Sequence, residues 1–151
     1  MSDPAWLDAD EQQAWRGLIA VAMLLPGAID GHLKPLADLT NFDYFILAVV
    51  SEAPDRAVRL RDLAAQSNSS LSRLSHAVSR LERRGLLRRR PDPADARTTD
   101  AVLTDAGWDL VTAVAPQHVA HVRDLVFDHL DAEQVRQLRD IAEVVCRRLV
   151  V

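Results

Sequence analysis

Apolar and polar residues recur with a helical period in the middle of the chain. At 100° per residue, one face of residues 70–84 collects five apolar side chains, namely Leu71, Leu74, Ala77, Val78 and Leu81. The opposite face carries hydroxyl, imidazole and guanidinium groups and no carboxylate, namely Ser72, Arg73, His76, Ser79, Arg80 and Arg83. The spacing predicts an amphipathic helix with one face for a core and the other for hydrogen bonding.

The flanks of this helix predict two further features. Residues 61–66 favour a short helix, and in the SNSS turn that follows Asn68 can take a left-handed conformation while Ser70 can cap the long helix. Gly85 is expected to end that helix, and two β-rich runs, LLRRR and residues 98–103, then surround the turn PDPADAR. A short strand is expected at residues 58–60. Together these elements predict a winged helix-turn-helix, whose second helix enters the major groove.

The remaining segments predict apolar helices. An N-terminal helix is interrupted by Pro26-Gly27, which predicts one kinked helix or two consecutive ones, and residues 42–51 form a nearly wholly apolar helix. Thr104 caps a later helix that Pro116 bends, and Asp131 opens the last one. Because the terminal helices are too apolar to stand in water alone, a homodimer is the economical arrangement.

The predicted fold class is mainly α with a small β-hairpin wing (α+β). With 151 residues and 48% hydrophobic content, the chain is long enough for one core. We expect a single unit over residues 1–151, with residues 40–104 as the DNA-binding lobe. Residues 8–38 and 105–151 are the expected dimerisation helices.

Charge is distributed unevenly along the chain. The net charge is −4, but residues 56–97 hold eleven arginines against four carboxylates, a net of +7, so the rest carries −11. An acidic body with a basic centre fits nucleic acid, because phosphate affinity depends on the local patch.

Other features restrict the location and chemistry. Cys146, as the only cysteine, excludes an intrachain disulfide and is expected to pack in the last helix. Residues 1–16 lack the apolar run of a signal peptide, and the apolar stretch 18–25 is too short to span a bilayer, so we expect a cytoplasmic protein without membrane contact. Without a Gly-rich phosphate loop, nucleophile elbow or HExxH motif, neither an enzyme nor a cofactor is expected.

Three segments carry a family resemblance, namely EQQAWRGL, SRLSHAVSRLERRGLLRR and the wing DPADARTTDAVLTDAG with its Asp95-x-Arg97 pair. The chain resembles the MarR (multiple antibiotic resistance regulator) family of winged-helix transcription factors from about residue 11 to residue 149. The resemblance implies a homodimer that binds a pseudo-palindromic operator in double-stranded DNA and usually represses transcription.

 By this resemblance, two copies of the chain pair through their N-terminal and C-terminal helices.

The resemblance also implies which residues contact DNA. The recognition positions of the family fall on five residues, namely Ser70, Ser72, Arg73, Ser75 and His76. Arg80 falls on a position that contacts the DNA backbone, and Arg97 on the wing tip that enters the minor groove. Asp95 is expected to orient Arg97 without contacting DNA.

Alternatives to a plain regulator remain at this point. Family members often bind small aromatic or phenolic acids between the lobe and the dimer helices, and Trp15, His32 and Tyr44 are candidates to line such a cavity. His118 and His121, spaced i and i+3, suggest a metal sensor, although zinc needs three or four convergent ligands, so packing histidines are favoured and no metal site is expected. A third reading is a DNA-inactive module that keeps the fold for dimerisation or partner binding.

Overall fold

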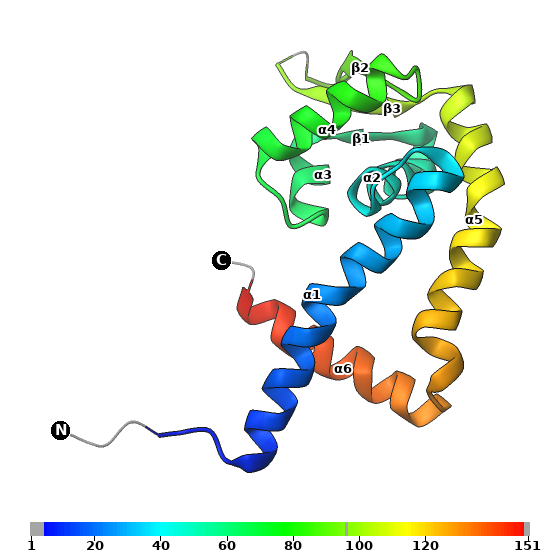
Figure 1. Ribbon diagram of the computed structural model, residues 1–151. Coiled ribbons are helices and arrows are strands. Elements are labelled where there is room, and N and C mark those ends of the chain that lie inside the picture. The colour runs from blue at the N-terminus through cyan, green and yellow to red at the C-terminus, as the bar shows by residue number, and fades with distance from the viewer. Residues whose placement is uncertain (1–4, 96, 150–151) are drawn as a thin grey trace.

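The computed structural model describes residues 5–95 and 97–149, and it is mainly helical with one small sheet (Figure 1). The α-helices are α1 (Ala9–Ala37), α2 (Asn41–Glu52), α3 (Leu60–Gln66), α4 (Leu71–Arg83), α5 (Asp105–Leu125) and α6 (Ala132–Leu149). Two short 3-10 helices, η1 (Pro54–Arg56) and η2 (Phe127–His129), and three strands, β1 (Ala57–Arg59), β2 (Leu87–Pro91) and β3 (Thr99–Leu103), complete the chain. The predicted fold class is confirmed.

The sheet is antiparallel, and β3 lies between β1 and β2. Ala101 at the centre of β3 pairs with Arg89 of β2 on one side and with Val58 of β1 on the other. The predicted hairpin is therefore present, and β1 adds a third strand to it. The predicted short strand ends one residue early, because Leu60 already begins α3.

Side-chain caps fix where the helices begin. Asp8 and Thr40 each form a capping box, with Glu11 and Asp43 respectively. Ser70 Oγ accepts a hydrogen bond from the Arg73 backbone N–H, as the sequence predicts, and Asn68 before it has a positive φ of 48°. These caps satisfy N–H groups that have no partner within a helix.

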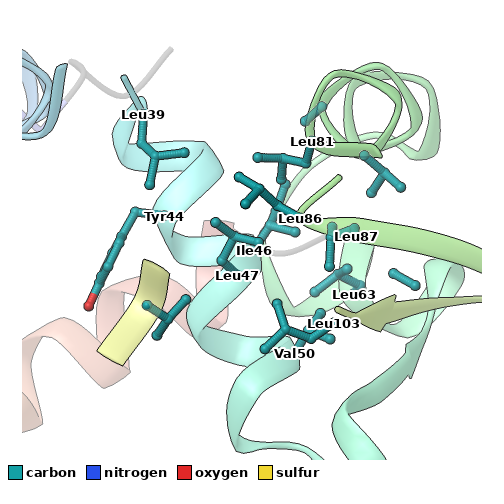
Figure 2. Close-up of a cluster of buried hydrophobic side chains, with 14 of the residues drawn as sticks. Leu39, Tyr44, Ile46, Leu47, Val50, Leu63, Leu81, Leu86, Leu87 and Leu103 are labelled. Atoms are coloured by element: carbon teal, nitrogen blue, oxygen red, sulfur yellow. The ribbon is translucent and has the colours of Figure 1, made fainter. Parts of the chain in front are cut away.

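The core centres on α2, which packs against α4, the sheet and parts of α1 and α5, and Figure 2 shows a part of this buried cluster. Leu47, Leu63 and Leu81 are fully buried there, from three different helices. Leu87 and Leu103 close the cluster from the two hairpin strands. The core therefore holds the helix-turn-helix and the wing together as one body.

At Gly107, the first turn of α5 packs closely against Leu86, the residue before β2. A Cβ at this position would lie 2.2 Å from the Leu86 carbonyl oxygen and 2.6 Å from a Leu103 methyl carbon. Thr104 Oγ1 caps α5 through the Gly107 N–H and also donates to the Gly85 carbonyl oxygen over 2.6 Å. Glycine is required here for close approach of the backbone.

α1 is one continuous helix through Pro26, which settles the two arrangements that the sequence allowed. Proline has no N–H group to donate to the carbonyl oxygen four residues earlier. For Pro26 that carbonyl belongs to Ala22, which is exposed, so water can bind it instead. The same holds for Pro116 within α5, because Thr112 is exposed. Pro26 and Pro116 therefore cost hydrogen bonds at the surface without ending their helices.

The N-terminal half of α1 extends away from the lobe (Figure 1), and apolar side chains are exposed along both α1 and α6. Leu18, Met23 and Leu24 of α1 and Ile141 and Val144 of α6 are all at least 48% exposed. By length and composition alone α1 could cross a membrane, with a mean hydropathy of 1.2 over its most apolar 18 residues. The apolar stretch is thus longer than the predicted residues 18–25.

Candidate nucleic-acid interface

The two faces of α4 agree with the predicted pattern. Leu74, Ala77, Val78 and Leu81 are buried, and four of the predicted recognition residues, Ser70, Ser72, Arg73 and His76, are exposed. Leu71 differs from the prediction, because it is 54% exposed. It is the first residue of α4, beyond the edge of the core, where helical phase no longer implies burial.

Arg73 is held against an aromatic ring. Its guanidinium carbon lies 4.4 Å from the centre of the Phe42 ring, which belongs to the first turn of α2. A cation over an aromatic face is stabilised by the ring quadrupole. The contact restricts the Arg73 side chain, yet leaves the residue exposed at the surface of α4.

Arg80 is paired within the protein. Its Nη2 donates to Asp43 Oδ1 over 2.5 Å, and the Asp43 side chain is only 4% exposed. Asp43 also closes the capping box of α2 with Thr40. Since the Arg80 side chain remains 45% exposed, it neutralises the buried carboxylate with part of its guanidinium and presents the rest to solvent.

Ser75 faces the wing. Both its carbonyl oxygen and its Oγ accept from Nη2 of Arg89, on β2, over 2.9 and 3.2 Å. The same guanidinium donates to Ser79 Oγ and to Glu82 Oε2, and the Arg89 backbone N–H donates to Glu82 Oε1. Sequence reasoning missed Arg89, because it was one arginine of a basic run whose alternating strand faces were not assigned.

The base of the wing is organised by a second residue that the sequence did not single out, Asp92. This carboxylate is 7% exposed and accepts from the Ala94 N–H, from Thr98 Oγ1 and from the Arg59 guanidinium. The Ala94 backbone hydrogen bond, helped by Arg59, lowers the pKa of Asp92 below its usual value. Asp92 therefore stays ionised and fixes the loop between β2 and β3.

Asp95 and Arg97 lie in that loop. Asp95 Oδ1 accepts from the Arg97 backbone N–H over 3.0 Å, and the Asp95 carbonyl accepts from the Thr98 N–H over 2.9 Å. Asp95 thus shapes the turn through the main chain, and Arg97 is exposed at its tip. α4 and the hairpin of β2 and β3 lie on the same lobe (Figure 1), so Arg73 and His76 of α4 and Arg97 of the wing are exposed on one part of the molecule.

A cavity of about 900 Å³ opens between α1, α2 and α4. Its lining combines aromatic, hydroxyl and basic side chains, including Phe42, Phe45, Ser70, Ser72, Arg73, His76 and Arg80. Of the three predicted ligand residues, Trp15, His32 and Tyr44, none lines this cavity. Trp15 is 53% exposed on the projecting part of α1, where it is far along the helix from the lobe.

His32 and Tyr44 instead meet the two histidines of α5. The rings of His32 and His121 are stacked, with 4.1 Å between their centres, and the ring centres of Tyr44 and His118 lie 4.3 Å apart. Burial, with repulsion from His32 and His121, lowers the pKa of His118. Within residues 5–95 and 97–149, no three histidine, cysteine or acidic side chains are arranged to hold a metal ion.

Three solved structures of related proteins have the same fold. Sco3205 of Streptomyces coelicolor, a MarR family regulator in complex with DNA, matches 99% of this chain and 93% of its own with 40% identity and a TM-score of 0.93. AbsC, from the same organism, matches 96% and 97% with 38% identity and a TM-score of 0.90. CouR of Rhodococcus jostii RHA1, bound to p-coumaroyl-CoA, matches 85% and 87% with 27% identity and a TM-score of 0.75.

Sequence comparison agrees with the structures. The transcriptional regulator HosA of Escherichia coli O111:H- is 33% identical over 82 residues, which are 54% of this chain and 58% of HosA. The match thus spans little more than half of that relative. A model of the MarR family matches residues 37–98, from the end of α1 to the loop between the two wing strands. The relatives are transcriptional regulators and not enzymes, and the chain belongs to the MarR family.

Proposed function

We propose that the protein is a transcriptional regulator that binds double-stranded DNA sequence-specifically as a homodimer. The observation that carries this proposal is the exposed polar face of α4 beside a wing with Arg97 at its tip. An α-helix fits the major groove, and an arginine in a narrow minor groove gains from the negative potential there. The DNA complex of Sco3205, 40% identical, supports the same use of this fold.

The predicted contact residues on α4 fall into groups with different proposed roles. Arg73 and His76 are the groups that read base edges, because they are exposed and can donate hydrogen bonds there. Ser70 and Ser72 lie at the start of α4, where backbone N–H groups favour a phosphate. Arg80 adds a phosphate contact with the exposed part of its guanidinium, whereas Ser75 acts through Arg89.

The dimer is proposed to form through residues 8–38 and 105–151, with residues 40–104 as the DNA-binding lobe. Apolar side chains along α1 and α6 support this division, since none of the α6 residues is buried within one chain. Large apolar side chains exposed in this number on two helices are typical of a protein interface. A two-fold dimer would present two recognition helices to half-sites about one helical turn apart.

A small anionic aromatic effector is a further part of the proposal. The cavity between α1, α2 and α4 combines aromatic rings with Arg73 and Arg80, which suits an aromatic carboxylate. CouR, solved with p-coumaroyl-CoA, supports an anionic ligand with an aromatic ring in a related fold. Because Arg73 and His76 also belong to the DNA-reading face, an occupied cavity would compete with DNA, which is the behaviour of a ligand-released repressor acting in the cytoplasm.

The test is a selection from random-sequence duplexes, followed by titration of the selected duplex and a scrambled one at two salt concentrations. The proposal predicts an enriched inverted repeat, bound at least about 10³-fold more tightly than the scrambled duplex, with an affinity that falls steeply with salt. A library that yields no enriched sequence, or equal affinity for the two duplexes, would contradict it. Sedimentation of the complex gives the number of chains bound.

A further inference from the structure

The recognition helix and the long N-terminal helix meet at Arg84, the residue that follows α4. Its Nη1 donates to the Asp38 carbonyl oxygen over 2.6 Å, and its Nη2 donates to the Ala37 carbonyl oxygen over 2.9 Å. Ala37 is the last residue of α1, 47 positions earlier in the chain. One side chain therefore joins the end of α4 directly to the end of α1.

The hydrogen bonds of Arg84 depend on the directions of its N–H groups and of the carbonyls at the end of α1. The last carbonyls of a helix have no partner within it and carry the negative end of its dipole, so a cation is favoured there. A guanidinium is planar and donates along fixed directions, whereas a lysine ammonium is a point charge on a flexible stem. Asp38 has a left-handed backbone, with φ of 53°, and so turns its carbonyl out of the helical path. The two hydrogen bonds of Arg84 consequently fix an angle as well as a distance.

A second connection reinforces the first. Asp30 of α1 accepts the backbone N–H of Asn41 over 2.6 Å, at the start of α2. From that same turn of α2, Asp43 binds Arg80, one helical turn before Arg84. The last turns of α4 are thus held to α1 both directly and through the N-terminus of α2.

The position of this joint makes its angle important. α1 extends from it for 29 residues, about 43 Å at 1.5 Å per residue, and carries the apolar side chains that form the proposed dimer. A small rotation between α1 and α4 would therefore move the recognition helix relative to the dimer axis. An added base pair moves a half-site by about 3.4 Å along the DNA and turns it by about 35°.

We propose that Arg84 is a positioning residue that makes the dimer selective for one spacing between half-sites. The inference rests on the proposed function of a DNA-binding homodimer. Arg84 needs no base contact in this role, because it acts by holding the angle between the recognition helix and the dimerisation helix. When its hydrogen bonds are lost, the lobe can turn to follow a half-site at another spacing.

The test uses the selected duplex and two versions with one base pair inserted or deleted between the half-sites. The full-length parent is compared with Arg84→Ala and Arg84→Lys at one salt concentration. Arg83→Ala is the matched control, because Arg83 is the exposed neighbour and its Nε bonds only within α4, to the Ser79 carbonyl oxygen. Thermal unfolding shows that each variant is folded.

The parent is expected to bind the altered spacings at least about tenfold more weakly, in the range of one mismatched base pair. We call the affinity for the selected duplex divided by the affinity for an altered spacing the spacing ratio. For Arg84→Ala the spacing ratio should fall below about threefold, and the ratio for Arg84→Lys should lie closer to that of Arg84→Ala than to that of the parent. Arg83→Ala should keep the parental ratio, because its side chain makes no hydrogen bond to α1. The spacing ratio is the decisive readout, because a general loss of stability would not change it.

An unchanged spacing ratio in folded Arg84→Ala would overturn the inference, and so would an equal loss of affinity for all three duplexes, since that marks a phosphate contact. If Arg84→Ala does not fold, Arg84→Lys decides, and a parental ratio in that variant overturns the inference. A parent that prefers no duplex at all would instead refute the proposed function. The two failures are therefore distinguishable.

Discussion

Arg89 of the wing and Glu82 of the recognition helix form an ion pair, with Nη1 and Oε2 2.6 Å apart. The Arg89 backbone N–H donates to the other oxygen of the same carboxylate over 3.0 Å. Since Arg89 also binds Ser75 and Ser79, a single strand residue holds nearly two turns of α4. The wing and the recognition helix are thereby oriented relative to each other before DNA binds.

Replacing Arg89 with Ala is expected to loosen this connection. The loss of its hydrogen bonds should lower the free energy of unfolding by about 1–2 kcal/mol, because Glu82 remains partly solvated. Sequence discrimination should fall more than non-specific DNA affinity. Arg88→Ala, on the exposed face of the same strand, is the control. Thermal unfolding and titration of selected against scrambled duplex measure both effects, and equal behaviour of the two variants would refute the prediction.

Replacing Gly107 with Ala should destabilise the fold. The new methyl group would lie 2.2 Å from the Leu86 carbonyl oxygen, so the start of α5 must shift away from the hairpin. Overpacking of this kind costs about 1–3 kcal/mol. Arg61→Ala, at an exposed position of α3 outside the proposed dimer interface, is the control and should change stability by less than about 0.5 kcal/mol. Urea titration of the two variants gives the comparison, and similar midpoints would count against the observed packing.

Stability should decline with falling pH through the effect of His118. Its pKa is lowered by burial and by His32 and His121, so the unfolded chain binds more protons than the folded chain. Stability therefore rises with pH in this range, and it is lost as pH falls through the ordinary value of 6.5 towards the lower folded value. The melting temperature should drop less between pH 7.5 and 5.5 in His118→Gln than in the parent. Equal drops would exclude His118 as the cause.

A charge on the exposed apolar face of α6 should separate the proposed dimer. Ile141 is 61% exposed in one chain, and Ile141→Arg would place a cation in the interface at a cost that association cannot repay. Leu71→Arg is the control, since Leu71 is 54% exposed but lies on α4, outside the proposed interface. Sedimentation should give a monomer for Ile141→Arg and a dimer for Leu71→Arg. A dimer in both variants would place the interface elsewhere.

The helical period identified the elements of the lobe, because burial there follows sequence spacing. Leu74, Ala77, Val78 and Leu81 are buried as predicted, and Ser70 caps α4. The continuity of α1 through Pro26 was left open, because it depends on whether water reaches the freed Ala22 carbonyl. Exposure of that kind is a property of the tertiary structure.

The candidate site was only partly predictable for the same reason. Residues that face solvent, such as Arg73 and His76, follow from helical phase. The partners of Arg89 lie on α4, 7 to 14 positions away, and Arg59, which binds Asp92, lies on β1, 33 positions away, so only the tertiary structure brings them together. The cavity is likewise lined by residues from α1, α2 and α4. Sequence spacing alone does not show which residues line it, so it could not show whether Trp15, His32 and Tyr44 do.

The central claim is that α4 and the wing bind DNA together, and a titration of the parent and of Arg97→Ala tests it most directly. Both proteins are titrated with the selected duplex across a series of salt concentrations. The parent should bind tightly with a steep salt dependence, and Arg97→Ala should bind more weakly with a salt slope reduced by about 1. Equal affinity and equal slope at matched salt would show that the wing tip does not contact DNA.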